Sequence, residues 1–286
     1  AKTAVAPGER LRIVAQTRSL YSNASEAPRI STLLRTMLDQ GGVRSFWRGN
    51  LTNCLRVFPN SALRFTLFNR LRNACDKDFR ESFSGALVLG AISGAISTSV
   101  TFPLDLLRTK LATDMLNSSS PRYRSLWHCG QETIRKGGWR SLYRGMGISV
   151  IEIMPYTALS LGGYDLCKSK LDFAGGKEAT IWNHLLVGWA AGLMASMVCY
   201  PLDTIKRHVM LEDKETRAAS VDGQVKGYPR TGVFSNSKIV RCSKRIFQSQ
   251  GLAGFYRGCL VNAAKAAPAA AISLVANDKL RSAFGL

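Results

Sequence analysis

One arrangement of a proline and two charged residues recurs three times along the chain. An acid stands two residues after the proline, and a base three residues after the acid, in "PGERLR" (7–12), "PLDLLR" (103–108) and "PLDTIK" (201–206). Carboxylates and cationic side chains form charge-assisted hydrogen bonds with one another. Three copies at one spacing therefore predict ion pairs between equivalent segments.

A second element follows each copy. It consists of an aromatic residue, an arginine and a glycine, and it occurs in "FWRGN" (46–50), "LYRGM" (142–146) and "FYRGC" (255–259). A proline follows each glycine at one distance: Pro59, Pro155 and Pro268. A two-part pattern found three times with the same inner spacing indicates tandem repeats. We predict repeats at 1–73, 74–171 and 172–286.

Each repeat contains two apolar stretches. The segment 83–102 has 20 residues without a charge, and a helix of about 20 apolar residues crosses a hydrocarbon core. Small residues in "GAISG" (90–94) and "GWAAG" (188–192) let membrane helices approach closely. The second stretches are 51–68, 147–164 and 259–276. The sequence thus predicts an all-α membrane protein with six transmembrane helices and pseudo-threefold symmetry.

The long loops within the repeats are basic. The segments 13–49, 109–145 and 211–258 contain 21 Lys and Arg against 8 Asp and Glu, so we expect them to share one compartment. Amphipathic pieces such as "ISTLLRTMLDQ" (30–40) predict one surface helix per loop. Few residues precede Pro7, so we expect the first helix to be N-terminally incomplete in this sequence.

Composition excludes several classes of protein. The net charge of +20 comes without a nucleic-acid-binding motif, so no nucleic acid partner is expected. The seven cysteines are single, and His128, His184 and His208 are scattered. We therefore expect no metal, no cofactor and no catalytic residue, which means that the protein is not an enzyme.

The two recurring elements resemble the signatures of the mitochondrial carrier family over almost the whole chain. Within it, "KTAVAPGERLR" (2–12) and "WRGNLTNCLRVFPNSALRF" (47–65) are similar to ADP/ATP carriers. The third repeat departs, because "KRHVML" (206–211) stands where those carriers have three arginines and three methionines. The resemblance implies a multi-pass protein of the mitochondrial inner membrane that exchanges a small anionic metabolite, best guess an adenine nucleotide, by alternating access.

The resemblance also implies a gate on the matrix side. Three proline-kinked helices would converge there, and Glu9 would pair with Arg108, Asp105 with Lys206, and Asp203 with Arg12. Gln16 resembles the glutamine that braces this ring in the family. The matrix-gate residues are Pro7, Glu9, Arg12, Gln16, Pro103, Asp105, Arg108, Pro201, Asp203 and Lys206. The alternative is that these charges only anchor helix ends at the interface.

A weaker gate is expected on the cytoplasmic side, where Asn69 replaces an acid of the family pattern. Its residues are Arg72, Asp165, Lys168, Asp278 and Arg281. The resemblance places the substrate between the gates, at Lys2, Arg56, Arg64, Glu152, Ile153, Tyr156 and Lys265. Glu152 is the exception among these residues. It would repel phosphate, pair internally with Arg56 or Lys265, or accept a hydrogen bond from an amine.

Cardiolipin and inner-membrane lipid are the expected partners of the aromatic-Arg-Gly elements, because N-terminal N–H groups and a basic residue bind anions. These residues are Trp47, Arg48, Gly49, Tyr143, Arg144, Gly145, Tyr256, Arg257 and Gly258. An aromatic belt is the alternative. Two other functions stay open: a carrier for an amino acid or another amine-bearing solute, and a non-transporting structural subunit of a respiratory-chain or ATP synthase assembly.

Overall fold

The computed structural model of the chain describes residues 2–17, 30–114, 122–174, 181–211, 236–266 and 268. Every regular element within these residues is helical, as the sequence predicts. The long helices are α1 (Ala6–Thr17), α3 (Asn50–Ala74), α5 (Phe83–Thr113), α7 (Met146–Ala174) and α8 (Ile181–Leu211). Residues 259–266 begin a further helix, and most of the predicted stretch 259–276 lies outside the described residues.

Each repeat also carries a surface helix followed by one 3-10 turn. These pairs are α2 (Ile30–Gly41) with η2 (Val43–Trp47), α6 (Leu126–Gly137) with η4 (Trp139–Tyr143), and α10 (Asn236–Gln250) with η5 (Leu252–Tyr256). The expected amphipathic helix at 30–40 is therefore present as α2. It buries Leu33 and Met37, which lie four residues apart on one face.

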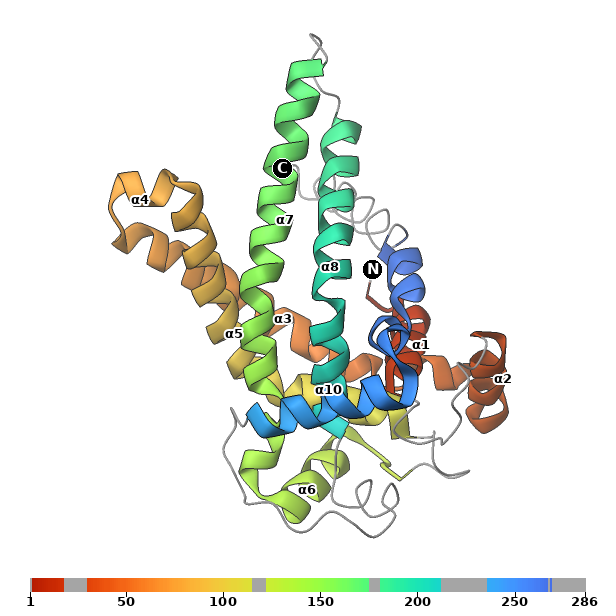
Figure 1. Cartoon of the computed structure of the whole chain (residues 1–286). Helices are drawn as coiled ribbons and strands as arrows, with labels where there is room; N and C mark the ends of the chain where they lie inside the picture. Colours follow the sequence, from red (N-terminus) through yellow and green to blue (C-terminus); the bar gives the residue numbers. More distant parts are fainter. Residues whose placement is uncertain are drawn as a thin grey trace, which may run out of the picture.

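The long helices pack as antiparallel neighbours in chain order. Helix α3 packs against α5 through a hairpin closed by the short α4 (Lys77–Glu81), α5 packs against α7, and α7 against α8. In Figure 1 the α3–α4–α5 hairpin and the α7–α8 hairpin point in different directions from a common base near α10. At that base α1, α5 and α8, the three helices with the Pro-x-acid-x-x-base motif, contact one another.

The buried apolar side chains lie at the same base. Each cluster joins a motif-bearing helix to the surface helix of its repeat: Leu11 and Val14 with Leu33 and Met37, Leu107 and Leu111 with Cys129, and Ile205 and Val209 with Cys242 and Ile246. Because Leu11, Leu107 and Ile205 are equivalent positions, as are Leu33, Cys129 and Cys242, the fold repeats with the sequence and holds the three motifs together.

Helix α5 has the side-chain distribution of a membrane helix. Its exposed face is an apolar stripe of Val88, Ile92, Ile96 and Val100, while Ser93 and Ser97 are buried. Of the helices in the described residues, α5 is the one whose length and apolar composition suffice for a membrane crossing. A large apolar stripe on the outside and small or polar residues inside suit a bundle in lipid, where helices associate through close packing.

The two small-residue patterns behave differently. A Cβ on Gly90 would lie 3.3 Å from Cγ2 of Thr157, and one on Gly94 would lie 3.1 Å from Cγ2 of Ile153, so "GAISG" packs α5 closely on α7 as predicted. At Gly192 no atom of the described residues lies within 4 Å. Ala191 makes the close contact on α8 instead, because a Cβ added to Gly163 of α7 would lie 3.4 Å from its Cβ.

Candidate functional site

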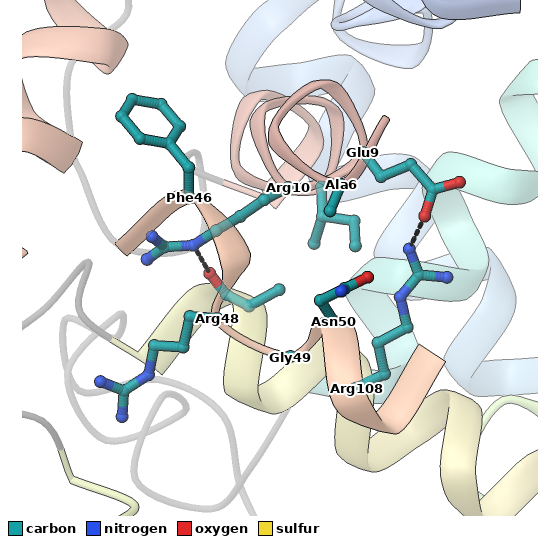
Figure 2. Close-up of a pocket in the computed structure, with 10 residues that line it drawn as sticks. Ala6, Glu9, Arg10, Phe46, Arg48, Gly49, Asn50 and Arg108 are labelled. Atoms are coloured by element: carbon teal, nitrogen blue, oxygen red, sulfur yellow. Dashed lines mark hydrogen bonds and ion pairs between the residues drawn. The ribbon is translucent and has the colours of Figure 1, made fainter. Parts of the chain in front are cut away.

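The three predicted ion pairs are all formed where α1, α5 and α8 meet. Arg12 Nη2 lies 2.5 Å from Asp203 Oδ2, Lys206 Nζ lies 3.2 Å from Asp105 Oδ2, and Arg108 hydrogen-bonds to Glu9 (Figure 2). We call these six residues the ion-pair ring. Each pair joins two different repeats, so the ring ties all three together. The predicted pairing is confirmed.

The acid of each motif follows its proline by two residues on α1, α5 or α8. Pro103 and Pro201 lie inside α5 and α8, which continue through them. Pro7 is the second residue of α1, a position where a helix needs no N–H donor. The predicted kink at each proline stays a prediction.

Gln16 braces the ring as expected. Its Nε2 donates to Asp203 Oδ2 at 3.0 Å and to Thr204 Oγ1 at 3.3 Å, and its side chain is buried. His208 Nε2 lies 2.9 Å from the Gln16 carbonyl oxygen and fixes the end of α1 to α8. A buried amide with these partners holds the Arg12–Asp203 pair in one geometry.

Two further side chains, which sequence reasoning missed, reach the ring. Arg207 Nε lies 3.3 Å from Asp203 Oδ2, the same oxygen that Arg12 contacts. Asn53 Nδ2 donates to Glu9 Oε2 at 3.1 Å. The spacing of four residues between Asp203 and Arg207 puts them on one helix face, so this contact could have been found. Asn53 on α3 offered no such signal.

Two of the predicted substrate residues lie directly above the ring and bind its acids. Arg56 Nε on α3 is 3.6 Å from Asp105 Oδ1, and Lys265 Nζ is 3.5 Å from Glu9 Oε1. Both side chains are mostly buried. Two cations from different repeats thus reach two carboxylates of the ring. Binding of the substrate by these cations stays a prediction.

Glu152 occupies the equivalent position on α7 and differs from both. The charged residues that interact most strongly with the Glu152 carboxyl group are Asp203, Lys206 and Arg207. Within the described residues it forms no ion pair, because Arg56 and Lys265 bind other acids. The internal pair with Arg56 or Lys265 is therefore not formed within the described residues.

The remaining predicted substrate residues make no ion pair with the ring within the described residues. Ile153 packs on α5 at Gly94, Tyr156 is partly exposed, and Lys2 and Arg64 are exposed. For the cytoplasmic gate, Arg72 is exposed in the last turn of α3. The side chains of Asp165 and Lys168, and the whole of Asp278 and Arg281, lie outside the described residues. That gate stays a prediction.

The aromatic-Arg-Gly elements lie at the starts of α3, α7 and the helix at 259, as expected. Trp47 Nε1 donates to the Thr3 carbonyl oxygen at 3.0 Å, and Tyr143 and Tyr256 stack on Phe102 and Tyr200. Arg48 donates to Asp114 and, at 2.8 Å, to the Tyr123 carbonyl oxygen. Lipid binding by these residues stays a prediction, and a lipid phosphate would have to share Arg48 with Asp114.

Comparison with known proteins agrees with this geometry. A family model described as mitochondrial carrier protein matches residues 1–78, 79–174 and 177–286. Human ADP/ATP translocase 4 is 30% identical over 99% of this chain and 87% of its own length, and bovine ADP/ATP translocase 3 is 32% identical over 98% and 92%. A probable envelope ADP,ATP carrier of Arabidopsis thaliana chloroplasts is 31% identical over 98% of this chain and 68% of that protein.

The family match covers nearly the whole chain in three consecutive segments, and each segment contains one copy of the motif that forms the ion-pair ring. This protein belongs to the mitochondrial carrier family.

Proposed function

We propose that the protein exchanges an adenine nucleotide across the mitochondrial inner membrane by alternating access. The observation that carries the proposal is the convergence of Arg56 and Lys265 on the ring, since two cations from different repeats can together hold a phosphate chain. The names of the relatives support an adenine nucleotide as the solute.

The ion-pair ring acts as the matrix gate in this proposal. Buried ion pairs contribute little net stability, because the desolvation of the charges offsets their attraction. A ring of such pairs can therefore open at modest cost. Arg72, Asp165, Lys168, Asp278 and Arg281 would close the opposite end, so that the solute site faces one compartment at a time.

We also propose an inner-membrane location, which the family model described as mitochondrial carrier protein supports. The Arabidopsis relative is named as a chloroplast envelope protein, so the location needs its own test. Cardiolipin is the proposed lipid at the starts of α3, α7 and the helix that begins at residue 259. Imaging of a tagged protein against markers of both organelles, in a host that has both, tests the location.

The test of the activity is exchange in liposomes that contain the purified protein. Vesicles loaded with ADP should take up labelled ATP, and vesicles without internal nucleotide should not. A thermal unfolding screen with nucleotides, amino acids and keto acids runs beside it, because a ligand that binds the native state raises Tm. Uptake of no solute, together with no shift of Tm, would favour the structural-subunit alternative.

A second candidate is a carrier for an amino acid or another amine-bearing solute. The absence of an ion pair at Glu152 within the described residues favours it, since a carboxylate that shares its surroundings with Lys206 and Arg207 suits a solute that carries both charges. Uptake of a labelled amino acid in place of ATP would establish this candidate.

A further inference from the structure

Three glycines of the aromatic-Arg-Gly elements stand against the backbone of the ion-pair ring. A Cβ on Gly49 would lie 3.3 Å from the carbonyl oxygen of Arg108, one on Gly145 would lie 3.4 Å from that of Lys206, and one on Gly258 would lie 3.2 Å from that of Arg12. Arg108, Lys206 and Arg12 are the three bases of the ring. We call Gly49, Gly145 and Gly258 the junction glycines.

Each base therefore makes two contacts with the same neighbouring repeat. The side chain of Arg108 pairs with Glu9 while its carbonyl oxygen meets Gly49, and both partners belong to the first copy of the motif and its following element (Figure 2). Lys206 makes the same two contacts with the second copy, and Arg12 with the third. The contacts follow one another around the ring and close it.

The junction glycines combine two features that favour glycine: a positive φ and a close contact with the next repeat. All three junction glycines have a positive φ, of 83°, 91° and 80°. Gly42, Gly138 and Gly251 also have a positive φ, of 58°, 70° and 62°, but no atom of the described residues lies within 4 Å of their Cβ positions. The two sets also differ in ψ, which is 0° at Gly49 and −162°, 179° and −159° at Gly42, Gly138 and Gly251.

The junction contact fixes the main chain at the base of each ion pair. The carbonyl group belongs to a helix and cannot rotate away without breaking the helix's own hydrogen bonds. An added Cβ at Gly49 or Gly258 would push the helix by some tenths of an ångström, and one at Gly145 would stand in ordinary contact with it. Hydrogen bonds between charged groups weaken when their distance grows by some tenths of an ångström. Glycine at this point keeps the base within reach of its acid.

We infer that Gly49, Gly145 and Gly258 are positioning residues of the gate, each of which sets the main chain of one ring base. This inference rests on the proposed function in one respect, because it treats the ring as the gate. It assigns to these glycines a role separate from the expected binding of lipid.

The first test compares alanine variants of the two sets of glycines in the full chain. Gly49→Ala and Gly42→Ala both place alanine at a positive φ in the first repeat, at ψ values of 0° and −162°, and the first alone would bring a Cβ to 3.3 Å from the main chain of a ring base. We expect the exchange rate of Gly49→Ala to be about threefold below that of Gly42→Ala, with the same KM, because the gate and not the solute contact has changed. Gly258→Ala against Gly251→Ala repeats the comparison, and Gly145→Ala, with a contact of 3.4 Å, should show a smaller effect. Equal rates within the pairs would overturn the inference.

The second test needs no transport. Removal of an ion pair should remove the effect of its own junction glycine and leave the others unchanged. The loss in Tm caused by Gly49→Ala should thus be smaller in a Glu9→Gln background and unchanged in an Asp105→Asn background. The loss in Tm caused by Gly145→Ala should be smaller in the Asp105→Asn background and unchanged in the Glu9→Gln background. Additive losses in both backgrounds would contradict the inference.

The two tests separate the inference from the proposed function. If the unmodified protein does not exchange nucleotide, the proposed function is refuted. The Tm comparison of the single and double variants still decides the role of the glycines. Should Gly258→Ala, which has the shortest contact, fail to fold, the variants at Gly49 and Gly145 decide the matter.

Discussion

Arg56 on α3 lies 3.6 Å from Asp105 on α5, measured from Nε to Oδ1. Asp105 also pairs with Lys206, so one carboxylate holds a cation of the substrate site and a cation of the ring at once. An anion that binds Arg56 must compete with Asp105 for it. The proposed substrate site and the ion-pair ring are therefore electrostatically linked. A variant at Arg56 is expected to affect the ring, and a variant at Asp105 is expected to affect the substrate site.

Exchange of the charges of one pair tests the ring. Asp105→Asn should lower the exchange rate, since Lys206 and Arg56 both lose their partner. The double variant Asp105→Lys with Lys206→Asp should recover part of the rate, and the recovery should stay incomplete because the new lysine faces Arg56. The measurement is initial uptake in liposomes. The same rate in the single and the double variant would rule out the pairing as a functional contact.

Neutralisation of the substrate-site cations should abolish uptake. A phosphate that enters a narrow site loses water, and a cation must replace it. Arg56→Gln and Lys265→Gln should each reduce nucleotide exchange at least about 100-fold, equivalent to roughly 3 kcal/mol of lost charge-assisted hydrogen bonding. Arg70→Gln, on an exposed part of α3, is the matched control and should keep full activity. Normal uptake by Arg56→Gln would place the solute elsewhere.

Removal of the brace should destabilise the protein. Gln16→Ala deletes two hydrogen bonds and leaves a buried oxygen of Asp203 with one donor fewer, which should cost about 1–3 kcal/mol. Thermal unfolding should show a lower Tm than in Gln248→Ala, whose side chain is exposed on α10. If the two variants unfold at the same temperature, Gln16 does not brace the ring.

Glu152 separates the two transport candidates. With a nucleotide as the solute, Glu152→Gly removes a carboxylate that repels phosphate, and uptake of labelled ATP should be preserved or raised. With an amine-bearing solute, the same change removes the acidic partner and should abolish uptake. Glu152→Gln, which keeps the size but not the charge, is the control for packing. Complete loss of nucleotide exchange in Glu152→Gly would count against the role given to this residue.

The basic loops should face the matrix. The longest of them, 212–235, lies outside the described residues, and its composition makes it a candidate for cleavage by protease. In mitochondria with a ruptured outer membrane and an intact inner membrane, added protease should leave this segment uncut, and detergent should expose it. Cleavage before detergent is added would reverse the predicted orientation.

Much of the site was determined by the sequence. The three ring pairs were predicted from the charged residues that recur at one spacing beside a proline, together with the resemblance to the carrier family. Gln16 beneath one of the pairs was predicted from the resemblance alone. A repeated spacing implies equivalent positions around a pseudo-threefold axis, and equivalent positions pair with their neighbours. The surface helix at 30–40 and the packing of Gly90 and Gly94 followed from helical periodicity in the same way.

Other relationships were decided by the tertiary structure. The binding of Arg56 to Asp105 and of Lys265 to Glu9, the lack of a partner at Glu152 in the described residues, and the approach of Gly49 to Arg108 depend on how far each helix is rotated and shifted against the next. Spacing along one chain does not contain this information, because a side chain reaches across a helix interface only at one relative rotation. The same reason explains Ala191, which packs on α7 where the pattern indicated Gly192: both are small, and the rotation of α8 selects the first.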